Sequence, residues 1–268
     1  MGGTHMQILY FLIAILATSI GATAGIGGGV IIKPILDFLG GYNLETINML
    51  SSFTVFSMAI VSIIKQIRYK FKLEIRKTVL IGFGSILGGI LGDYILNKII
   101  DIVNNDAKVI MYQNIILAIL LIAVFIYMNN KNNMKQFKIE NSLLCIIIGM
   151  GLGTISSFLS IGGGPVNVCV LTLFFSMDTK EAAVNSIITI LFSQMPKIFT
   201  SIDNVFAGYY DLTMLPVMVI GGIIGGIVGS KLNKNMSNEF IVRVLNMVIL
   251  SLVLLNIYNV LGAFRQIY

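Results

Sequence analysis

Charged residues are scarce in this chain, and several reactive side chains are nearly absent. Only 11% of the 268 residues are charged against 56% hydrophobic, with one histidine, two cysteines and no tryptophan. A soluble domain of this size could not bury so large a share of apolar side chains. The composition therefore predicts an all-α polytopic membrane protein.

The shortage of histidine and cysteine also limits the chemistry. The histidine, His5, lies in Met1–His5, which we interpret as a remnant of an expression tag, with native translation starting at Met6. Cys145 and Cys169 lie in apolar stretches, where thiols usually serve as small core residues. Hydrolysis needs an activated nucleophile or a metal cluster. We therefore expect no enzyme activity, no metal and no cofactor.

The net charge of +6 does not indicate nucleic-acid binding. Basic residues gather in short polar linkers at 65–77, 129–141 and 231–238, whereas 101–109 and 201–209 are acidic. Linkers on the cytoplasmic face of a membrane are typically rich in lysine and arginine. We therefore expect the three basic linkers in the cytoplasm, in a multi-pass protein of the plasma membrane whose surroundings are lipid.

Glycine is plentiful and forms the most informative motif. Ile-Gly-Gly-Gly-Val at 26–30 recurs as Ile-Gly-Gly-Gly-Pro at 161–165, 135 positions later. Consecutive glycines usually end a helix, because each costs about 1 kcal/mol relative to alanine inside one. Backbone groups freed at membrane depth need partners. The two breaks therefore predict one shared site between two halves of the chain.

Other features repeat along with the breaks. Ser51 and Ser186 follow them at the same offset, and Gly-xxx-Gly spans, typical of close helix packing, occur at 84–92 and 221–229. Internal repeats of this kind are common in secondary transporters. We expect three parts after the tag remnant: a first repeat at 6–128, a cytoplasmic linker at 129–141 and a second repeat at 142–268.

The limbs that follow the breaks are too short to cross a bilayer. Residues 30–39 and 165–176 reach only about 15 Å and about 18 Å as helices, against a hydrocarbon core of about 30 Å. We expect each limb to turn back to the side from which its segment entered. The predicted fold is two inverted repeats, each a re-entrant glycine-broken helical hairpin plus three transmembrane helices, with both termini outside.

These motifs resemble those of the TauE/SafE sulfite exporter family. The resemblance is carried by residues 24–29 and 160–165, by Ser51-Ser52 and Asn185-Ser186, and by the Gly-xxx-Gly spans, so it covers nearly the whole chain. It implies transport of small sulfur-containing anions, such as sulfite, sulfonates or thiosulfate, across a bacterial-type inner membrane. One departure is Asn48-Met49-Leu50, where family members usually place small residues before the serine.

The chemistry expected at the breaks is anion binding. Free N–H groups near Val30 and Pro165, with the partial positive charge of each helix start, suit an anion. Hydroxyls and amides on the next helices would donate to its oxygens, or else form helix–helix hydrogen bonds. The substrate-binding candidates are Gly27, Gly28, Gly29, Val30, Lys33, Ser51, Ser52, Ser160, Gly162, Gly163, Gly164, Asn167, Asn185 and Ser186.

The charged residues near the breaks leave two interpretations open. Lys33 either completes the anion site or snorkels toward the outer interface. Asp37 and Asp93 are candidates for proton coupling, or simply lie near that interface; sodium could instead bind backbone carbonyls at the breaks. Pro196 with Lys197 predicts a kink and an interfacial anchor.

Taken together, the sequence predicts a secondary transporter with alternating access. Two hairpin tips would hold a small anion near the bilayer midplane while one repeat rocks against the other. The alternatives are an anion channel and a non-transporting membrane subunit or receptor. The sequence leaves open whether the chain forms a homo-oligomer, and which direction and coupling ion it uses.

Overall fold

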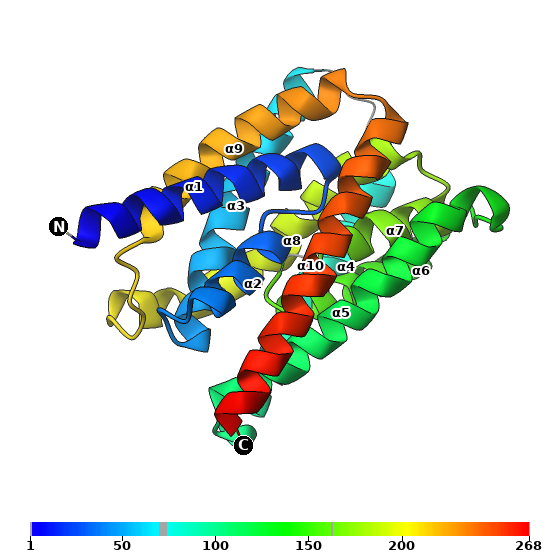
Figure 1. Cartoon of the computed structure of the whole chain (residues 1–268). Helices are drawn as coiled ribbons and strands as arrows, with labels where there is room; N and C mark the ends of the chain where they lie inside the picture. The colour runs from blue at the N-terminus through cyan, green and yellow to red at the C-terminus, as the bar shows by residue number, and fades with distance from the viewer. Residues whose placement is uncertain (1, 70–73, 162, 268) are drawn as a thin grey trace.

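The computed structural model describes residues 2–69, 74–161 and 163–267, and every regular element in that part of the chain is helical. Figure 1 shows the helices packed as one bundle. In chain order they are α1 (Gly2–Ala24), α2 (Gly29–Leu39), α3 (Leu44–Arg68), α4 (Ile75–Val103), α5 (Asp106–Asn130), η1 (Lys131–Asn133), α6 (Ser142–Phe158), α7 (Gly164–Phe175), α8 (Thr179–Phe206), α9 (Leu215–Asn235) and α10 (Asn238–Ile267).

Both glycine motifs end a helix, as predicted. The first separates α1 from the 11-residue α2, and the second separates α6 from the 12-residue α7. Gly25 and Ser160, at equivalent positions just before the breaks, both adopt the left-handed backbone region, with φ of 72° and 53°. The two halves therefore use the same local conformation to leave the helix.

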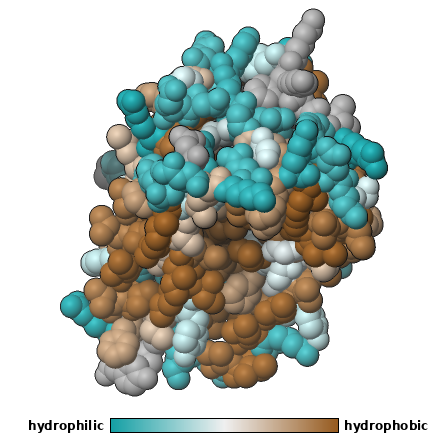
Figure 2. Space-filling view, turned by 90° about the vertical axis from the view of Figure 1, so that its right-hand side faces the viewer, coloured by the Kyte–Doolittle hydropathy of each residue, from teal (hydrophilic) through white to brown (hydrophobic). Residues whose placement is uncertain are grey.

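Among the residues that the structure describes, seven helices are long and apolar enough to cross a membrane: α1, α3, α4, α5, α8, α9 and α10. α1 is one of them, so the first hairpin is not two equal half-helices: a limb of span length precedes a short one. In the second hairpin both limbs are short apolar helices. Figure 2 shows a broad hydrophobic surface over the middle and lower part of one face, with hydrophilic residues gathered above it.

One end of the bundle collects the basic linkers. The Nζ of Lys234, at the end of α9, lies 4.4 Å from the ring centre of Tyr69, which follows α3. The Nζ of Lys180, in the first turn of α8, donates to the carbonyl oxygen of Lys234 at 2.7 Å. The N–H of Phe137 donates to the carbonyl of Leu173 at 2.7 Å, so the end of α7 lies beside the segment that leads into α6.

The opposite end collects the two termini and the acidic linkers. Tyr10 of α1 contacts Tyr42, which follows α2, edge to face at 5.9 Å between ring centres. Phe38 of α2 and Tyr258 of α10 are 5.3 Å apart by the same measure. In Figure 1 both termini lie far from the α9–α10 connection. The end of α2 therefore returns toward the start of α1, just as α7 returns toward the start of α6.

Equivalent helices of the two halves make equivalent contacts, each with a helix of the other half. α1 packs on α9, whereas its equivalent α6 packs on α4, the equivalent of α9. A Cβ on Gly88 of α4 would lie 1.9 Å from the carbonyl oxygen of Met150 in α6, and one on Gly229 of α9 would lie 2.3 Å from that of Ser19 in α1. The Gly-xxx-Gly spans thus serve backbone-to-backbone packing, as predicted. Reciprocal contacts of this kind are what a two-fold relation produces.

Candidate functional site

The two breaks pack directly against each other in the interior. A Cβ on Gly164 would lie 1.6 Å from the carbonyl oxygen of Ile26, and a Cβ on Gly29 would lie 2.6 Å from that of Ile161. These are equivalent pairs with the halves exchanged, at the offset of 135 residues. Two segments far apart in the sequence therefore form one place in the fold. Gly162 falls outside the described residues.

The helices that start at the breaks lack the caps found elsewhere. α2 and α7 begin after Gly28 and Gly163, and neither receives a side-chain hydrogen bond at its start. The first N–H groups of a helix have no partner inside it and carry part of the positive end of its dipole. By contrast, side chains cap the starts of four helices whose first residues lie near the two ends of the bundle: Asn43 (α3), Asn105 (α5), Asn141 (α6) and Asp178 (α8). The first N–H groups of α2 and α7 thus have no side-chain acceptor, a property that they share with the starts of α4 and α9.

The first break is held from within the protein. The Oγ of Ser186 in α8 donates to the carbonyl oxygen of Gly25 at 2.7 Å. The N–H of Gly27 donates to the carbonyl of Gly21 at 3.3 Å. Val30, in the first turn of α2, is completely buried. Ser186, a candidate for substrate binding, therefore uses its only hydroxyl proton on the backbone of the break.

Asn185 also has protein partners. Its side-chain oxygen accepts a hydrogen bond from the Oγ1 of Thr78 in α4. Its side-chain nitrogen donates to the carbonyl oxygen of Glu181 at 2.9 Å. For this residue the structure shows the helix–helix hydrogen bond that the sequence left open as an alternative.

Three other candidates have polar atoms with no hydrogen-bond partner among the described residues. The side-chain oxygen and nitrogen of Asn167, the Oγ of Ser51 and the Oγ of Ser52 are all in this state, and all three residues are buried. Asn167 lies beside the second break, because a Cβ on Gly163 would meet its side-chain oxygen at 3.1 Å. A buried polar group without a partner costs about 1–3 kcal/mol. These atoms therefore suit a polar ligand.

Polar side chains from α6 and α8 surround the second break. The hydroxyls of Ser156 and Ser193 are 3.0 Å apart, and the side-chain nitrogen of Gln194 donates to Ser156 at 3.4 Å. The side-chain oxygen of Gln194 and the hydroxyl of Ser157 have no partner among the described residues. The start of α7 is thus set in a hydrophilic environment inside an apolar bundle.

Lys197 belongs to this environment, so its prediction as an interfacial anchor was wrong. It is only 2% exposed, and its Nζ donates to the Oγ of Ser160 at 2.7 Å. The same Nζ lies 3.9 Å from a carboxylate oxygen of Asp93. The cause is packing: Lys197 lies nine residues before the end of α8, on the face of this helix that packs against α4 and α6.

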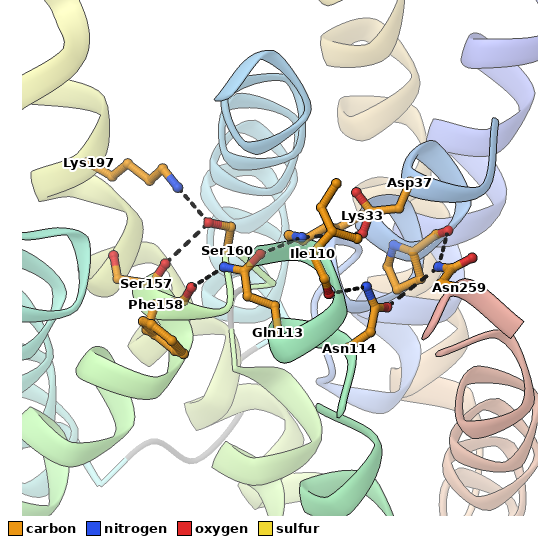
Figure 3. A network of polar contacts seen from close by, with 11 residues as sticks. Lys33, Asp37, Ile110, Gln113, Asn114, Ser157, Phe158, Ser160, Lys197 and Asn259 are labelled. Carbon is orange, nitrogen blue, oxygen red and sulfur yellow. Dashed lines mark hydrogen bonds and ion pairs between the residues drawn. The ribbon is translucent and has the colours of Figure 1, made fainter. Parts of the chain in front are cut away.

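The first half contributes a second buried lysine. Lys33 is 2% exposed, and its Nζ lies 3.3 Å from Asp37 and 3.1 Å from the side-chain oxygen of Gln113 in α5. Gln113 in turn donates to the carbonyl oxygen of Phe158, the last residue of α6, at 2.6 Å. Figure 3 shows this chain of contacts, with Ser160 between the two lysines. Lys33 therefore does not snorkel, and its charge is already paired.

The two carboxylates proposed for coupling lie in different surroundings. The side chain of Asp37 is 2% exposed, with one oxygen unpartnered among the described residues, and it lies two residues before the end of α2. The side chain of Asp93 is 13% exposed and lines a cavity of about 320 Å³ between α3, α4 and α8. Asn48 and Lys197 also line this cavity, which extends toward the end of the bundle that carries Tyr209.

Comparison with known proteins agrees with the architecture. Residues 10–257 match the family model described as sulfite exporter TauE/SafE. One relative, named a probable membrane transporter protein, comes from Methanocaldococcus jannaschii; it is 26% identical over 175 residues, which cover 62% of this chain and 61% of that protein. No solved structure gives a significant match. Since the family match spans most of the chain, the protein belongs to the sulfite exporter TauE/SafE family of membrane transporters.

Proposed function

We propose that the protein is a secondary transporter of small sulfur-containing anions of the sulfite, sulfonate or thiosulfate class. The observation that carries this proposal is the meeting of two uncapped helix starts in the interior. Discontinuous helices whose N-termini point at an anion are a recurring device of secondary transporters. The family membership supports sulfur oxyanions as the substrate class.

The topology that we propose is two inverted repeats, at 6–128 and 142–268, joined by the linker 129–141. The reciprocal packing of α1 on α9 and α6 on α4 supports it. So does the return of each short helix toward the start of its own hairpin, since the two hairpins start from opposite ends of the bundle. The positive-inside rule then assigns the basic end to the cytoplasm and both termini to the outside.

The anion site that we propose combines backbone and side-chain donors. The N–H groups at the starts of α2 and α7 supply the positive ends of two helix dipoles. Ser51, Ser52 and Asn167 supply polar atoms that have no partner among the described residues. Such fixed donors replace the hydration shell that the anion loses on entering the protein.

Coupling would fall to the carboxylates that contact the buried lysines. Asp37 pairs with Lys33 inside the protein, and Asp93 lies 3.9 Å from Lys197 in the lining of the cavity. Protonation of either carboxylate changes the net charge beside the anion path, which is what proton coupling requires. The sequence predicts that one repeat rocks against the other during alternating access. Two packing groups, α1–α3–α9 and α4–α6–α8, each draw helices from both halves, so we propose these groups as the moving bodies instead of the repeats themselves.

Counterflow in proteoliposomes tests the proposed function. Vesicles loaded with unlabelled sulfite should take up radiolabelled sulfite against its gradient, and the rate should saturate with external concentration. Uptake without saturation or counterflow would identify a channel. Binding of sulfite, methanesulfonate or thiosulfate without any uptake would identify a receptor or subunit, and no response to any of the three would contradict the proposal.

A further inference from the structure

We propose that Lys197 is the side-chain cation that binds the transported anion, and that the anion displaces the carboxylate of Asp93 from it. The inference rests on the proposed function, which it extends by naming the charged contact. It also identifies the cavity between α3, α4 and α8 as the path by which the anion reaches or leaves the breaks.

The two buried lysines differ in how fully their charges are compensated. Lys33 has a carboxylate oxygen of Asp37 at 3.3 Å and an amide oxygen of Gln113 at 3.1 Å. Lys197 has a neutral hydroxyl at 2.7 Å, that of Ser160, and its carboxylate at 3.9 Å. Taking a charge out of water is costly unless a counter-charge lies close. Lys197 is therefore the lysine with more to gain from an external anion.

Access separates the two lysines as well. Lys197 lines the cavity of about 320 Å³, together with Asp93 and Asn48. A small oxyanion fits within such a volume, beside Lys197 and Asp93. Lys33 is not among the residues that line this cavity, since it lies against α5 through Gln113.

Lys197 is also connected to the second break. Its hydrogen-bond partner Ser160 precedes Ile161, whose carbonyl faces Gly29 of the first break. The unpartnered polar atoms of Ser157 and Asn167 lie on the two helices that flank this break. An anion that takes the place of Asp93 at Lys197 is therefore next to the uncapped start of α7, where Figure 3 shows Ser160 between the two lysines.

The carboxylates that line the cavity should weaken anion binding, which is the opposite of the effect of Lys197. Glu45, Asp93 and Asp101 line the same cavity as Lys197. Their negative charge opposes an anion, and Asp93 competes directly for the lysine. Replacing Asp93 with a neutral residue should therefore strengthen anion binding, because it removes both the competitor for Lys197 and a negative charge from the path.

Direct binding to the purified full-length protein tests the inference, with sulfite, methanesulfonate and thiosulfate titrated by calorimetry under anaerobic conditions. We expect Lys197→Gln to weaken binding about 10- to 100-fold, the range of one hydrogen bond to a charged group, and Lys197→Arg to restore part of it. We expect Asp93→Asn to bind more tightly than the unmodified protein. Lys98→Gln is the matched control, because Lys98 is an exposed lysine near Asp93 on α4 that contacts the Tyr94 ring.

The outcomes are distinct. If the unmodified protein binds none of the three anions, the proposed function fails and not only the assignment of Lys197. If it binds them and Lys197→Gln binds equally well, or if the loss is confined to Lys33→Gln, the assignment is wrong. Asp93→Asn keeps the lysine, so weaker or unchanged binding by this variant overturns the displacement even if Lys197→Gln does not fold.

Discussion

The two glycine breaks match in sequence but differ in backbone and in surroundings: Gly28 has a φ of −68°, whereas its equivalent Gly163 has a φ of 68°. Around the second break stand Ser157, Ser160, Asn167, Gln194 and Lys197. The equivalent positions around the first break, 135 residues earlier, are less polar: Ala22, Gly25, Ile32, Ala59 and Ser62. Both halves supply an uncapped helix start, whereas the second half supplies most of the polar side chains. The second half therefore differs from the first mainly in its polar side chains, and we expect the specific chemistry to depend largely on them.

The buried ion pairs sharpen this comparison, and breaking them should give the largest effect on stability. We expect Asp37→Asn to cost about 3–5 kcal/mol, because it leaves the Lys33 charge buried without its carboxylate. Asp93→Asn should cost much less, since Asp93 is partly exposed and lies 3.9 Å from its lysine. Thermal unfolding of the purified variants measures both. The double variant Lys33→Gln/Asp37→Asn should recover stability, and equal losses for the two aspartates would contradict the contrast.

The second largest effect is expected from substitutions at the contact between the two breaks. Gly164→Ala places a Cβ 1.6 Å from the Ile26 carbonyl oxygen, so we expect a loss of about 1–3 kcal/mol and slower transport. Gly29→Ala should be milder, since its nearest contact would be 2.6 Å. Unfolding temperature and sulfite counterflow are the measurements. Gly151→Ala on α6 is the control, because its Cβ would have no atom within 4 Å, and an equal loss there would show that the clash is not the cause.

The paired serines after the breaks should separate structure from binding. Ser186→Ala removes the hydroxyl that donates to Gly25, so we expect a loss of about 1–3 kcal/mol in unfolding free energy. Ser51→Ala removes an unpartnered hydroxyl, so stability should change little while anion affinity falls. Unfolding and calorimetric titration of the two variants make the comparison. If both serines behave alike in both measurements, their roles are not divided as the structure indicates.

The smallest effect on the protein is expected from cysteine substitutions that test which end of the bundle faces the cytoplasm. In a variant without Cys145 and Cys169, a cysteine replacing Asn204 should react with an impermeant reagent from outside intact cells, whereas one replacing Asn235 should not. Both asparagines are exposed, at opposite ends of the bundle. Labelling of the Asn235 position from outside would overturn the inverted topology.

Much of this architecture could be predicted from residue spacing alone. Three glycines in a row usually break a helix, and a limb of ten residues cannot span a bilayer. The Gly-xxx-Gly spacing likewise specified a packing face before the partner helix was known. Each of these features depends only on residues that are close together in the sequence, so each could be predicted without the structure.

The missed residues depended on packing between distant segments. Lys197 was mistaken for an interfacial anchor because the sequence does not show which face of a helix is covered by other helices. One signal could have identified it: Ser186, Thr189, Ser193 and Lys197 recur at helical spacing and form one polar stripe along α8. Gln113 gave no such signal, since it is one of two adjacent amides in an apolar segment.

The exchanged packing of α1 and α6 has a consequence for the order of synthesis. α6 finds its partner α4 already made when it leaves the ribosome, with α5 and the short η1 between them. α1 packs on α9, which is among the last helices to be produced. Until then the small residues of the α1 face that meets α9 have only lipid to contact. Maturation of the first hairpin must therefore wait for α9, which is synthesised long after it.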